Sequence, residues 1–117
     1  MIKGIGIDMV ELSRIEKIII NKSSFIKRVL TDKEYAIFQN LPHKRQVEFL
    51  AGRFACKEAF SKAWGTGIGN VGLQDVEILK EDSGAPTVTK SPHDGKVFVS
   101  ISHTDTFAVA QIILETP

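Results

Sequence analysis

The chain has 117 residues with a single cysteine and a formal net charge of +1, and its length predicts one domain over 1–117 that can fold alone. The near-zero charge argues against nucleic acid as a partner, and one cysteine excludes both an internal disulfide and a cysteine-based zinc site, as suits a reducing cytoplasm. No apolar run reaches membrane-spanning length and the first residues lack a signal-peptide pattern, so we expect a cytoplasmic protein with no membrane partner.

Residues 2–10 have the alternation of a β-strand, and one of its two sides carries Gly4, Gly6 and Asp8. Glycine weakens a strand and is usually kept where a ligand or another backbone comes close. We therefore expect either an open groove that ends at the Asp8 carboxylate, or a bulge with Asp8 facing solvent.

Residues 11–20 have the pattern of a short amphipathic helix, with Leu12 and Ile15 on its apolar side. The segment from 14 to 28, which overlaps this helix, carries an excess of basic side chains. Such a run is either a solvated face or a surface that attracts an acidic partner, because complementary charge speeds encounter. The basic residues considered for this docking surface are Arg14, Lys17, Lys22 and Arg28.

Thr31-Asp-Lys-Glu34 has the form of a capping box and predicts a helix through about Gln39. A longer helix then begins near His43 and runs to Trp64, where Gly65 is a natural residue to end it. The first turn of this long helix contains two cations, Lys44 and Arg45, which is unfavourable against the helix dipole. They indicate a bound anion nearby, unless solvent satisfies both.

The second half of the long helix departs from its apolar pattern, because the apolar line through Phe54 continues into Glu58. A carboxylate in an apolar position is costly to desolvate unless a cation or metal meets it. Glu58 therefore either pairs with Lys62 on a solvated face or belongs to a functional site. Arg53 and Lys57 are expected to form a basic edge beside it.

The chain after the long helix is predicted to be mainly β-structure, with strands at 75–79, 87–89, 96–103 and 107–114. Gly67-Ile-Gly69-Asn-Val-Gly72 matches the letters of a dinucleotide-binding fingerprint, but it follows a helix and leads towards a strand. We interpret it as a loop and expect no Rossmann fold. His103, at the end of the third of these strands, is either a hydrogen-bonded rim histidine or an anion ligand.

The candidate site residues are of two kinds, hard oxygen ligands and anion-binding cations. Asp8 and Glu58 are the oxygen ligands. The anion-binding candidates are Arg53, Lys57, Lys62 and His103. Two carboxylates among cations are the groups that hold Mg²⁺ on a phosphate or diphosphate, so the residues alone favour metal-assisted phosphoryl-type transfer.

The order of three segments makes this interpretation more specific. They are Gly4-Ile-Gly-Ile-Asp8, Phe54-Ala-Cys-Lys57-Glu58-Ala-Phe-Ser-Lys62-Ala, and Ser100-Ile-Ser-His103. Together they resemble the 4′-phosphopantetheinyl transferase superfamily, in which an Asp-bearing strand precedes a K-E-A-x-x-K helix. The short chain is similar to the small bacterial type of that superfamily, the holo-acyl-carrier-protein synthases. The resemblance covers essentially the whole chain; one small departure is Ala85, where members often carry a polar or basic residue.

This resemblance implies both a fold and an activity. The fold would be α+β, with a long central helix packed on a mainly antiparallel sheet. The enzyme would transfer the 4′-phosphopantetheine group of coenzyme A to a serine of apo-acyl carrier protein. The reaction would depend on Mg²⁺, release adenosine 3′,5′-bisphosphate and support fatty acid biosynthesis.

The resemblance also implies roles for individual residues. Asp8 and Glu58 would be Mg²⁺ ligands, and Lys62 would neutralise the phosphate charge that grows on the leaving group. The chemistry leaves two candidates for the general base, Glu58 and a metal-bound water. The candidates for the nucleotide end of coenzyme A are Lys44, Arg45, Arg53 and His103, with Gly84 and Pro86 lining the adenine pocket. Arg14 and the basic face after it would receive the acidic helix of the carrier protein.

Larger relatives carry two copies of this fold with the site between them, whereas this chain has one copy. The resemblance therefore implies a homotrimer with three sites at subunit interfaces. Two other classes of protein stay open. One is a binding module for coenzyme A or an adenine nucleotide without transfer, and the other is a structural or regulatory protein whose basic segment docks an acidic partner.

Overall fold

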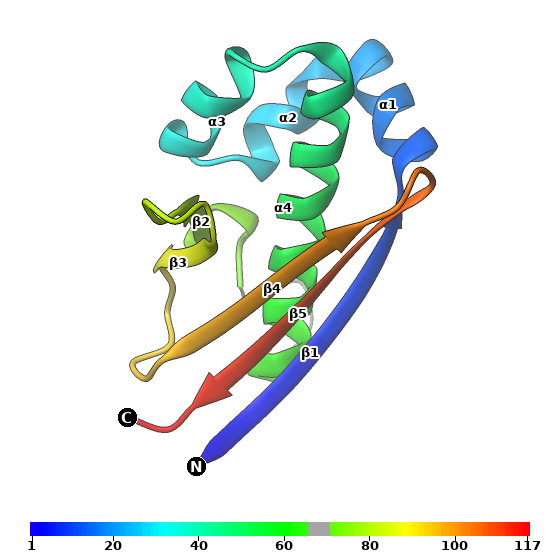
Figure 1. Cartoon of the computed structure of the whole chain (residues 1–117). Coiled ribbons are helices and arrows are strands. Elements are labelled where there is room, and N and C mark those ends of the chain that lie inside the picture. The colour runs from blue at the N-terminus through cyan, green and yellow to red at the C-terminus, as the bar shows by residue number, and fades with distance from the viewer. Residues whose placement is uncertain (66–70) are drawn as a thin grey trace.

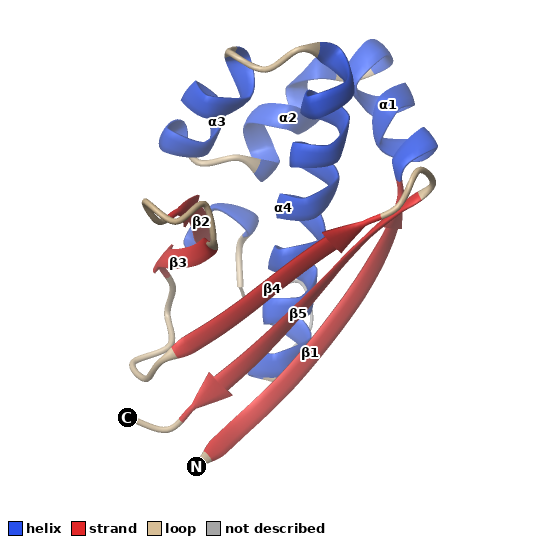
Figure 2. Ribbon diagram, in the orientation of Figure 1, coloured by secondary structure: helices blue, strands red, loops and turns tan. Residues whose placement is uncertain are grey.

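The structure is a computed structural model that describes residues 1–65 and 71–117, with helices in the first half and strands mainly in the second (Figure 1, Figure 2). In chain order the elements are β1 (Ile2–Glu11), α1 (Leu12–Asn21), α2 (Ser23–Val29), α3 (Asp32–Gln39), α4 (His43–Trp64), the 3₁₀ turn η1 (Leu73–Asp75), β2 (Glu77–Lys80), β3 (Pro86–Lys90), β4 (Val97–His103) and β5 (Phe107–Glu115). The expected α+β class with an antiparallel sheet is confirmed. Residues 67–70 of the glycine-rich segment interpreted as a loop lie outside the described residues.

The main sheet contains β1, β5 and β4 in that order, with all neighbours antiparallel. In β5 every second side chain is apolar and completely or almost completely buried, beginning with Ala108 and ending with Leu114. This side of the sheet packs on α4, which runs along it (Figure 1). β2 and β3 form a separate hairpin beside α4 and β4 rather than extending the sheet.

Two glycines allow α4 to lie directly against β1. A Cβ atom at Gly6 would lie 1.8 Å from the carbonyl oxygen of Ala59, and one at Gly4 would lie 2.1 Å from that of Ala63. Of the two alternatives for this side of the strand, the open groove is therefore wrong, because the helix backbone fills it. The register is irregular between Ile2 and Gly4, as in a bulge, but Asp8 accepts a hydrogen bond from Lys62. Of the two usual reasons for glycine in a strand, close approach of another backbone applies here.

The helix boundaries follow local signals in the sequence. The capping box of α3 is confirmed: the Glu34 N–H donates to Thr31 Oγ1 at 3.3 Å, and the Thr31 N–H donates to Glu34 Oε1 at 2.9 Å. α4 begins at His43 as expected, and Gly65 ends it in the left-handed conformation with a φ of 89°. α2 was not anticipated, because its seven residues are too few for a clear period.

The centre of α4 supplies much of the core. Leu50, Ala55 and Phe60 are fully buried, as is Cys56. Burial raises the pKa of the Cys56 thiol to about 12, so this side chain is a small apolar core residue and not a nucleophile. None of the helices within 1–65 and 71–117 is both long and apolar enough to cross a membrane.

The face of the sheet that points away from α4 is exposed and apolar. Its large side chains Ile5, Ile7, Met9 and Phe98 are 58%, 57%, 61% and 48% exposed. They lie on β1 and β4, the two strands that flank β5, and Ile5 and Phe98 both stand opposite Ile113 of β5. An apolar patch of this kind on a small domain commonly marks a surface that another protein covers.

Candidate active site

Three candidate residues meet where α4 crosses β1, namely Asp8 of the strand and Glu58 and Lys62 of the helix. Lys62 Nζ donates to Asp8 Oδ1 at 2.9 Å and to the carbonyl oxygen of Ile7 at 3.0 Å. Lys62 therefore pairs with Asp8 rather than with Glu58, and Glu58 has no ion-pair partner among residues 1–65 and 71–117. Of the two alternatives for Glu58, the simple ion pair with Lys62 is therefore wrong within this described part of the chain.

The two carboxylates share a pocket of about 320 Å³. It is lined by Asp8, Met9, Val10, Glu11, Arg14, Phe54, Glu58 and Phe107. Burial and then the negative charge of Asp8 raise the pKa of Glu58, while Lys62 and Arg14 act in the opposite direction. The cations present thus leave the second carboxylate incompletely neutralised, and an additional cation between the two acids would be favoured.

The ligand set fits Mg²⁺ in its chemistry. Within residues 1–65 and 71–117 no three His, Cys, Asp or Glu side chains cluster to enclose a metal. Mg²⁺ commonly uses only one or two carboxylates and completes its octahedron with waters and substrate phosphates. Asp8 and Glu58 are therefore a sufficient protein contribution for Mg²⁺ on a phosphorylated substrate.

A second pocket, of about 240 Å³, lies between α4, the β2–β3 hairpin and β4. Four of the predicted nucleotide-binding residues line it, namely Arg45, Arg53, Pro86 and His103. Its lining also includes Glu48, which lies 3.5 Å from Arg45 Nε and 3.8 Å from His103 Nδ1. The sequence reasoning missed Glu48, although its position three residues after Arg45 on a helix could have indicated the contact.

Arg53 is the most constrained cation of this second pocket. It is only 5% exposed, its guanidinium lies 4.1 Å from the centre of the Phe49 ring, and its Nε donates to the carbonyl oxygen of Ile78 at 3.2 Å. Its Nη2 is buried and has no hydrogen-bond partner among the described residues. Burial lowers the pKa of Arg53. A buried donor without a partner is unfavourable, so an anion in the pocket would stabilise it.

Three predicted site residues lie elsewhere. Lys44 lines a neighbouring pocket with His43, and Gly84 sits in the exposed turn of the β2–β3 hairpin. The prediction that Arg53 and Lys57 form a basic edge is wrong, because both side chains are buried. Lys57 is 1% exposed and is paired with Glu34, so it has no free position for an anion.

The two pockets lie on opposite flanks of α4. Arg53 and Glu58 are five residues apart, which corresponds to about 140° around a helix. Asp8 lies on β1 and His103 on β4, which are the two edges of the sheet. The chain therefore brings together the carboxylates with Lys62, and separately the nucleotide-binding candidates, but it does not bring the two groups together.

The basic segment borders the carboxylate pocket. Arg14 of α1 lines that pocket, and the side chains of Lys17, Lys22 and Arg28 are exposed on or beside α1 and α2. Arg28 lies 5.8 Å from the Phe25 ring, and Phe25 packs at 5.6 Å on Phe54, another lining residue of the pocket. A partner docked on this segment would lie next to the two acids.

Comparisons with known proteins agree on one family. The model of the 4′-phosphopantetheinyl transferase superfamily matches residues 4–112. A holo-[acyl-carrier-protein] synthase of Enterococcus faecalis is 70% identical over 116 residues, 99% of each chain, and one of Streptococcus thermophilus is 56% identical over 115 residues, 98% of this chain and 97% of the relative. The crystal structure of a Bacillus anthracis holo-(acyl-carrier-protein) synthase in complex with CoA (3′,5′-ADP) superposes with a TM-score of 0.93 at 47% identity, over 100% of this chain and 99% of the other.

Proposed function

The chain belongs to the 4′-phosphopantetheinyl transferase superfamily, and from this premise we propose that it transfers the 4′-phosphopantetheine group of coenzyme A to a serine of apo-acyl carrier protein. The reaction would use Mg²⁺, take place in the cytoplasm and serve fatty acid biosynthesis. The observation that carries the proposal is the meeting of Asp8, Glu58 and Lys62 in and beside one pocket.

The residues of this pocket suit attack on a diphosphate. The serine oxygen forms a bond to the phosphorus that bears the pantetheine arm, and the bond from that phosphorus to the bridging oxygen of adenosine 3′,5′-bisphosphate breaks. Asp8 and Glu58 would hold Mg²⁺, which supplies neutralisation of the diphosphate charge. The ammonium of Lys62 would stabilise the negative charge on the leaving bisphosphate. The serine proton would pass to Glu58, whose first role here is as a metal ligand.

The second pocket is proposed to hold the nucleotide end of coenzyme A. Arg53 offers a buried guanidinium nitrogen that lacks a partner in the described part of the chain, and Arg45 and His103 line the same space. These groups suit the 3′-phosphate, and Pro86 suits the adenine ring. Lys44 and Gly84 would contact the nucleotide from just outside this pocket.

The position of the two pockets supports a homotrimer with sites between subunits. The carboxylates and the nucleotide-binding candidates lie on opposite flanks of α4, so a complete site needs a second copy. The exposed apolar face of the sheet is a surface that copies could bury against one another. The carrier protein would then dock on the basic segment around Arg14, beside the reacting groups.

Transfer is tested directly by mass spectrometry of apo-acyl carrier protein after incubation with coenzyme A, Mg²⁺ and this protein. We expect the carrier to gain the mass of one phosphopantetheine group. We expect no gain after chelation of the metal, or with Asp8→Ala or Glu58→Ala that retain the wild-type circular dichroism spectrum. A carrier of unchanged mass with the wild-type protein would leave only a coenzyme A binding module.

The shared site is tested by mixing two variants that are each impaired in a different half of the site. In the first variant, Asp8→Ala removes one carboxylate of the Mg²⁺ pocket. In the second variant, Arg53→Ala weakens the nucleotide pocket. In a mixed trimer, the carboxylate half of an Arg53→Ala subunit can face the intact nucleotide pocket of an Asp8→Ala subunit. We expect activity to return on mixing after subunit exchange, whereas sites built within single chains would stay impaired.

A further inference from the structure

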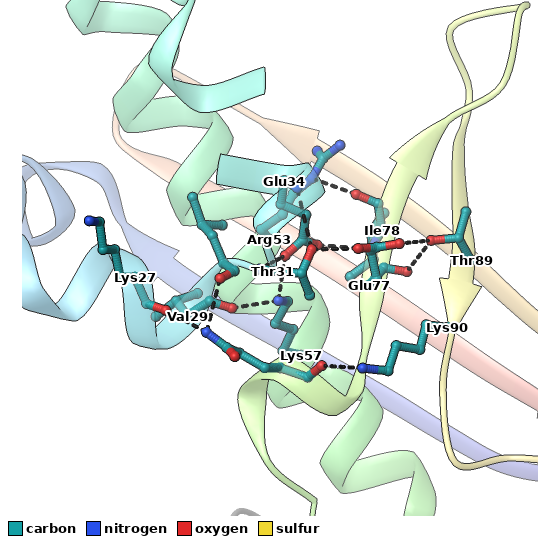
Figure 3. Close-up of polar contacts among 12 residues, drawn as sticks. Lys27, Val29, Thr31, Glu34, Arg53, Lys57, Glu77, Ile78, Thr89 and Lys90 are labelled. Atoms are coloured by element: carbon teal, nitrogen blue, oxygen red, sulfur yellow. Dashed lines mark hydrogen bonds and ion pairs between the residues drawn. The ribbon is translucent and has the colours of Figure 1, made fainter. Parts of the chain in front are cut away.

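A connected group of buried polar side chains lies between α4, α3 and β2 (Figure 3). Lys57 of α4 is 1% exposed, and Glu34 of α3 is 0% exposed. Lys57 Nζ donates to Glu34 Oε1 at 2.6 Å and to the carbonyl oxygen of Val29 at 2.5 Å. The assigned roles of the two pockets use neither of these charged groups.

Glu34 connects this ion pair to the β2–β3 hairpin. Its Oε2 accepts a hydrogen bond from the backbone N–H of Ile78 in β2 at 2.8 Å. The carbonyl oxygen of Ile78 then accepts the hydrogen bond from Arg53 Nε. A chain of contacts therefore runs from Lys57 through Glu34 and Ile78 to the guanidinium that lines the nucleotide pocket (Figure 3).

The neighbouring residue of β2 is held in the same way. Glu77 Oε2 accepts from Thr31 Oγ1 at 2.5 Å, and Glu77 Oε1 accepts from Thr89 Oγ1 of β3 at 2.7 Å. The hairpin does not pair with the main sheet by a strand ladder in the described structure. These polar contacts, with the buried side chains of Val76 and Ile78, therefore hold β2 against α3 and α4, in addition to the packing of β3 on β4.

We propose that Glu34 and Lys57 are a positioning pair, whose buried contacts place the β2–β3 hairpin and Arg53 so that the nucleotide pocket is preformed. The inference rests on the proposed function, because it takes this pocket to bind the nucleotide end of coenzyme A. The hairpin supplies Lys80 and Pro86 to the pocket lining, so a shift of β2 changes the pocket wall as well as Arg53.

The choice of a buried ion pair for this task has a physical reason. A buried pair is often no more stabilising than apolar residues of similar volume, but its hydrogen bonds are directional and can specify one arrangement. Lys57 uses its donors on a carboxylate and a carbonyl from two different segments. Removing only Lys57 would leave the Glu34 charge buried without a partner, which is strongly destabilising. The test therefore removes both charges together.

The main test uses the double variant Glu34→Gln/Lys57→Met, with the exposed Lys3→Met of β1 as the control for loss of a lysine charge. Glutamine can still act in a capping box, and methionine has a side chain of similar length to lysine but no charge. We expect the double variant to fold. Its dissociation constant for adenosine 3′,5′-bisphosphate, measured by calorimetry, should rise roughly 10- to 100-fold, the effect of losing a hydrogen bond to a charged group. In turnover, KM for coenzyme A should rise while kcat and KM for carrier protein stay unchanged.

A second readout does not depend on any ligand. Hydrogen exchange of the Ile78 amide, followed by NMR, should become at least tenfold faster in the double variant, because the glutamine side chain cannot satisfy every donor around position 34. The control should match the wild-type protein in both measurements. If the double variant is insoluble, Glu34→Asp is used instead, because it keeps both charges but shortens the side chain. We again expect weaker bisphosphate binding and faster exchange of the Ile78 amide.

The outcomes separate the two proposals. Equal bisphosphate affinity for the wild-type protein and the double variant, or unchanged exchange at Ile78, would overturn the positioning role and leave the proposed function standing. A lower melting temperature with unchanged affinity would also overturn it, because the pair would then act on stability alone. Failure of the wild-type protein to bind the bisphosphate would overturn the assignment of the pocket and this inference together.

Discussion

The contact between Gly6 and Ala59 leads to a quantitative prediction for Gly6→Ala. The added Cβ would lie 1.8 Å from a carbonyl oxygen, and the distance would have to rise to about 3.4 Å for ordinary contact. The carbonyl oxygen belongs to the backbone of α4 and the added methyl group is attached directly to the backbone of β1, so neither can rotate away. Overpacking costs about 1–3 kcal/mol, and alanine recovers about 0.5–1 kcal/mol of the backbone entropy that glycine loses on folding. We therefore expect a net loss of up to about 2.5 kcal/mol in the free energy of unfolding.

The same substitution should damage activity more than stability. To accommodate the methyl group, α4 has to move away from β1, which separates Glu58 and Lys62 from Asp8. A displacement of about 1 Å between reacting groups can lower turnover about 100-fold. Urea unfolding followed by the fluorescence of the single Trp64 measures the first effect, and transfer to carrier protein measures the second.

Gly52→Ala is the matched control for stability. It adds a methyl group to the same helix, where the new atom would lie 3.2 Å from the Ile101 side chain and no backbone. Alanine is favoured over glycine inside a helix by up to about 1 kcal/mol, so this variant should be neutral or slightly more stable. A Gly6→Ala protein with wild-type stability and turnover would refute the close contact of α4 with β1.

Three further outcomes are expected around the carboxylate pocket. Glu58→Gln should stabilise the metal-free protein near neutral pH, because the folded-state pKa of Glu58 is raised above its ordinary 4.5. This gain in the free energy of unfolding should shrink as pH falls through the folded-state pKa and vanish below pH 4.5. Urea titrations measure it, and a gain that persists at lower pH would contradict the expected sign. Lys62→Met should lower kcat about 100- to 1000-fold and raise the pKa of Glu58 further in an NMR titration, whereas Lys3→Met should change neither. Arg14→Glu should raise KM for an acidic carrier protein without changing bisphosphate binding, and equal damage to both would exclude the docking assignment.

Local signals in the sequence were enough to place most elements. The capping box at Thr31, the glycine at position 65 and the alternation from Val97 to His103 each depend on residues close together in the chain, and the structure has each feature where expected. The hairpin strand expected at 75–79 begins two residues later, after a 3₁₀ turn, because the apolar pattern does not distinguish the turn from the strand start.

The errors concern contacts between distant segments. The pattern of its own helix predicts that Lys57 belongs to an exposed basic edge, whereas its burial depends on other elements. Its partner Glu34 is 23 residues earlier and carries no local mark beyond its place in a capping box. In the same way, the pattern of β1 predicts that something approaches Gly6, but it does not identify α4 as the neighbour.

The candidate site was predicted in its parts but not in its arrangement. The interruption of an apolar line identified Glu58, and the strand pattern identified Asp8. Helical periodicity gives the angle between Arg53 and Glu58, yet it does not say that the hairpin covers one flank and β1 the other. That arrangement depends on the strand order β1-β5-β4, which no short segment determines.

The burial of Cys56 has a practical use. Because this only thiol of the chain is in the core and its pKa is about 12, an alkylating reagent should reach it only when the molecule opens. The rate of modification under native conditions therefore reports how often the core of α4 opens, without a label or an added mutation. A cysteine introduced on the surface would in turn react alone, so fluorescent probes could be attached at chosen positions without first removing the natural residue.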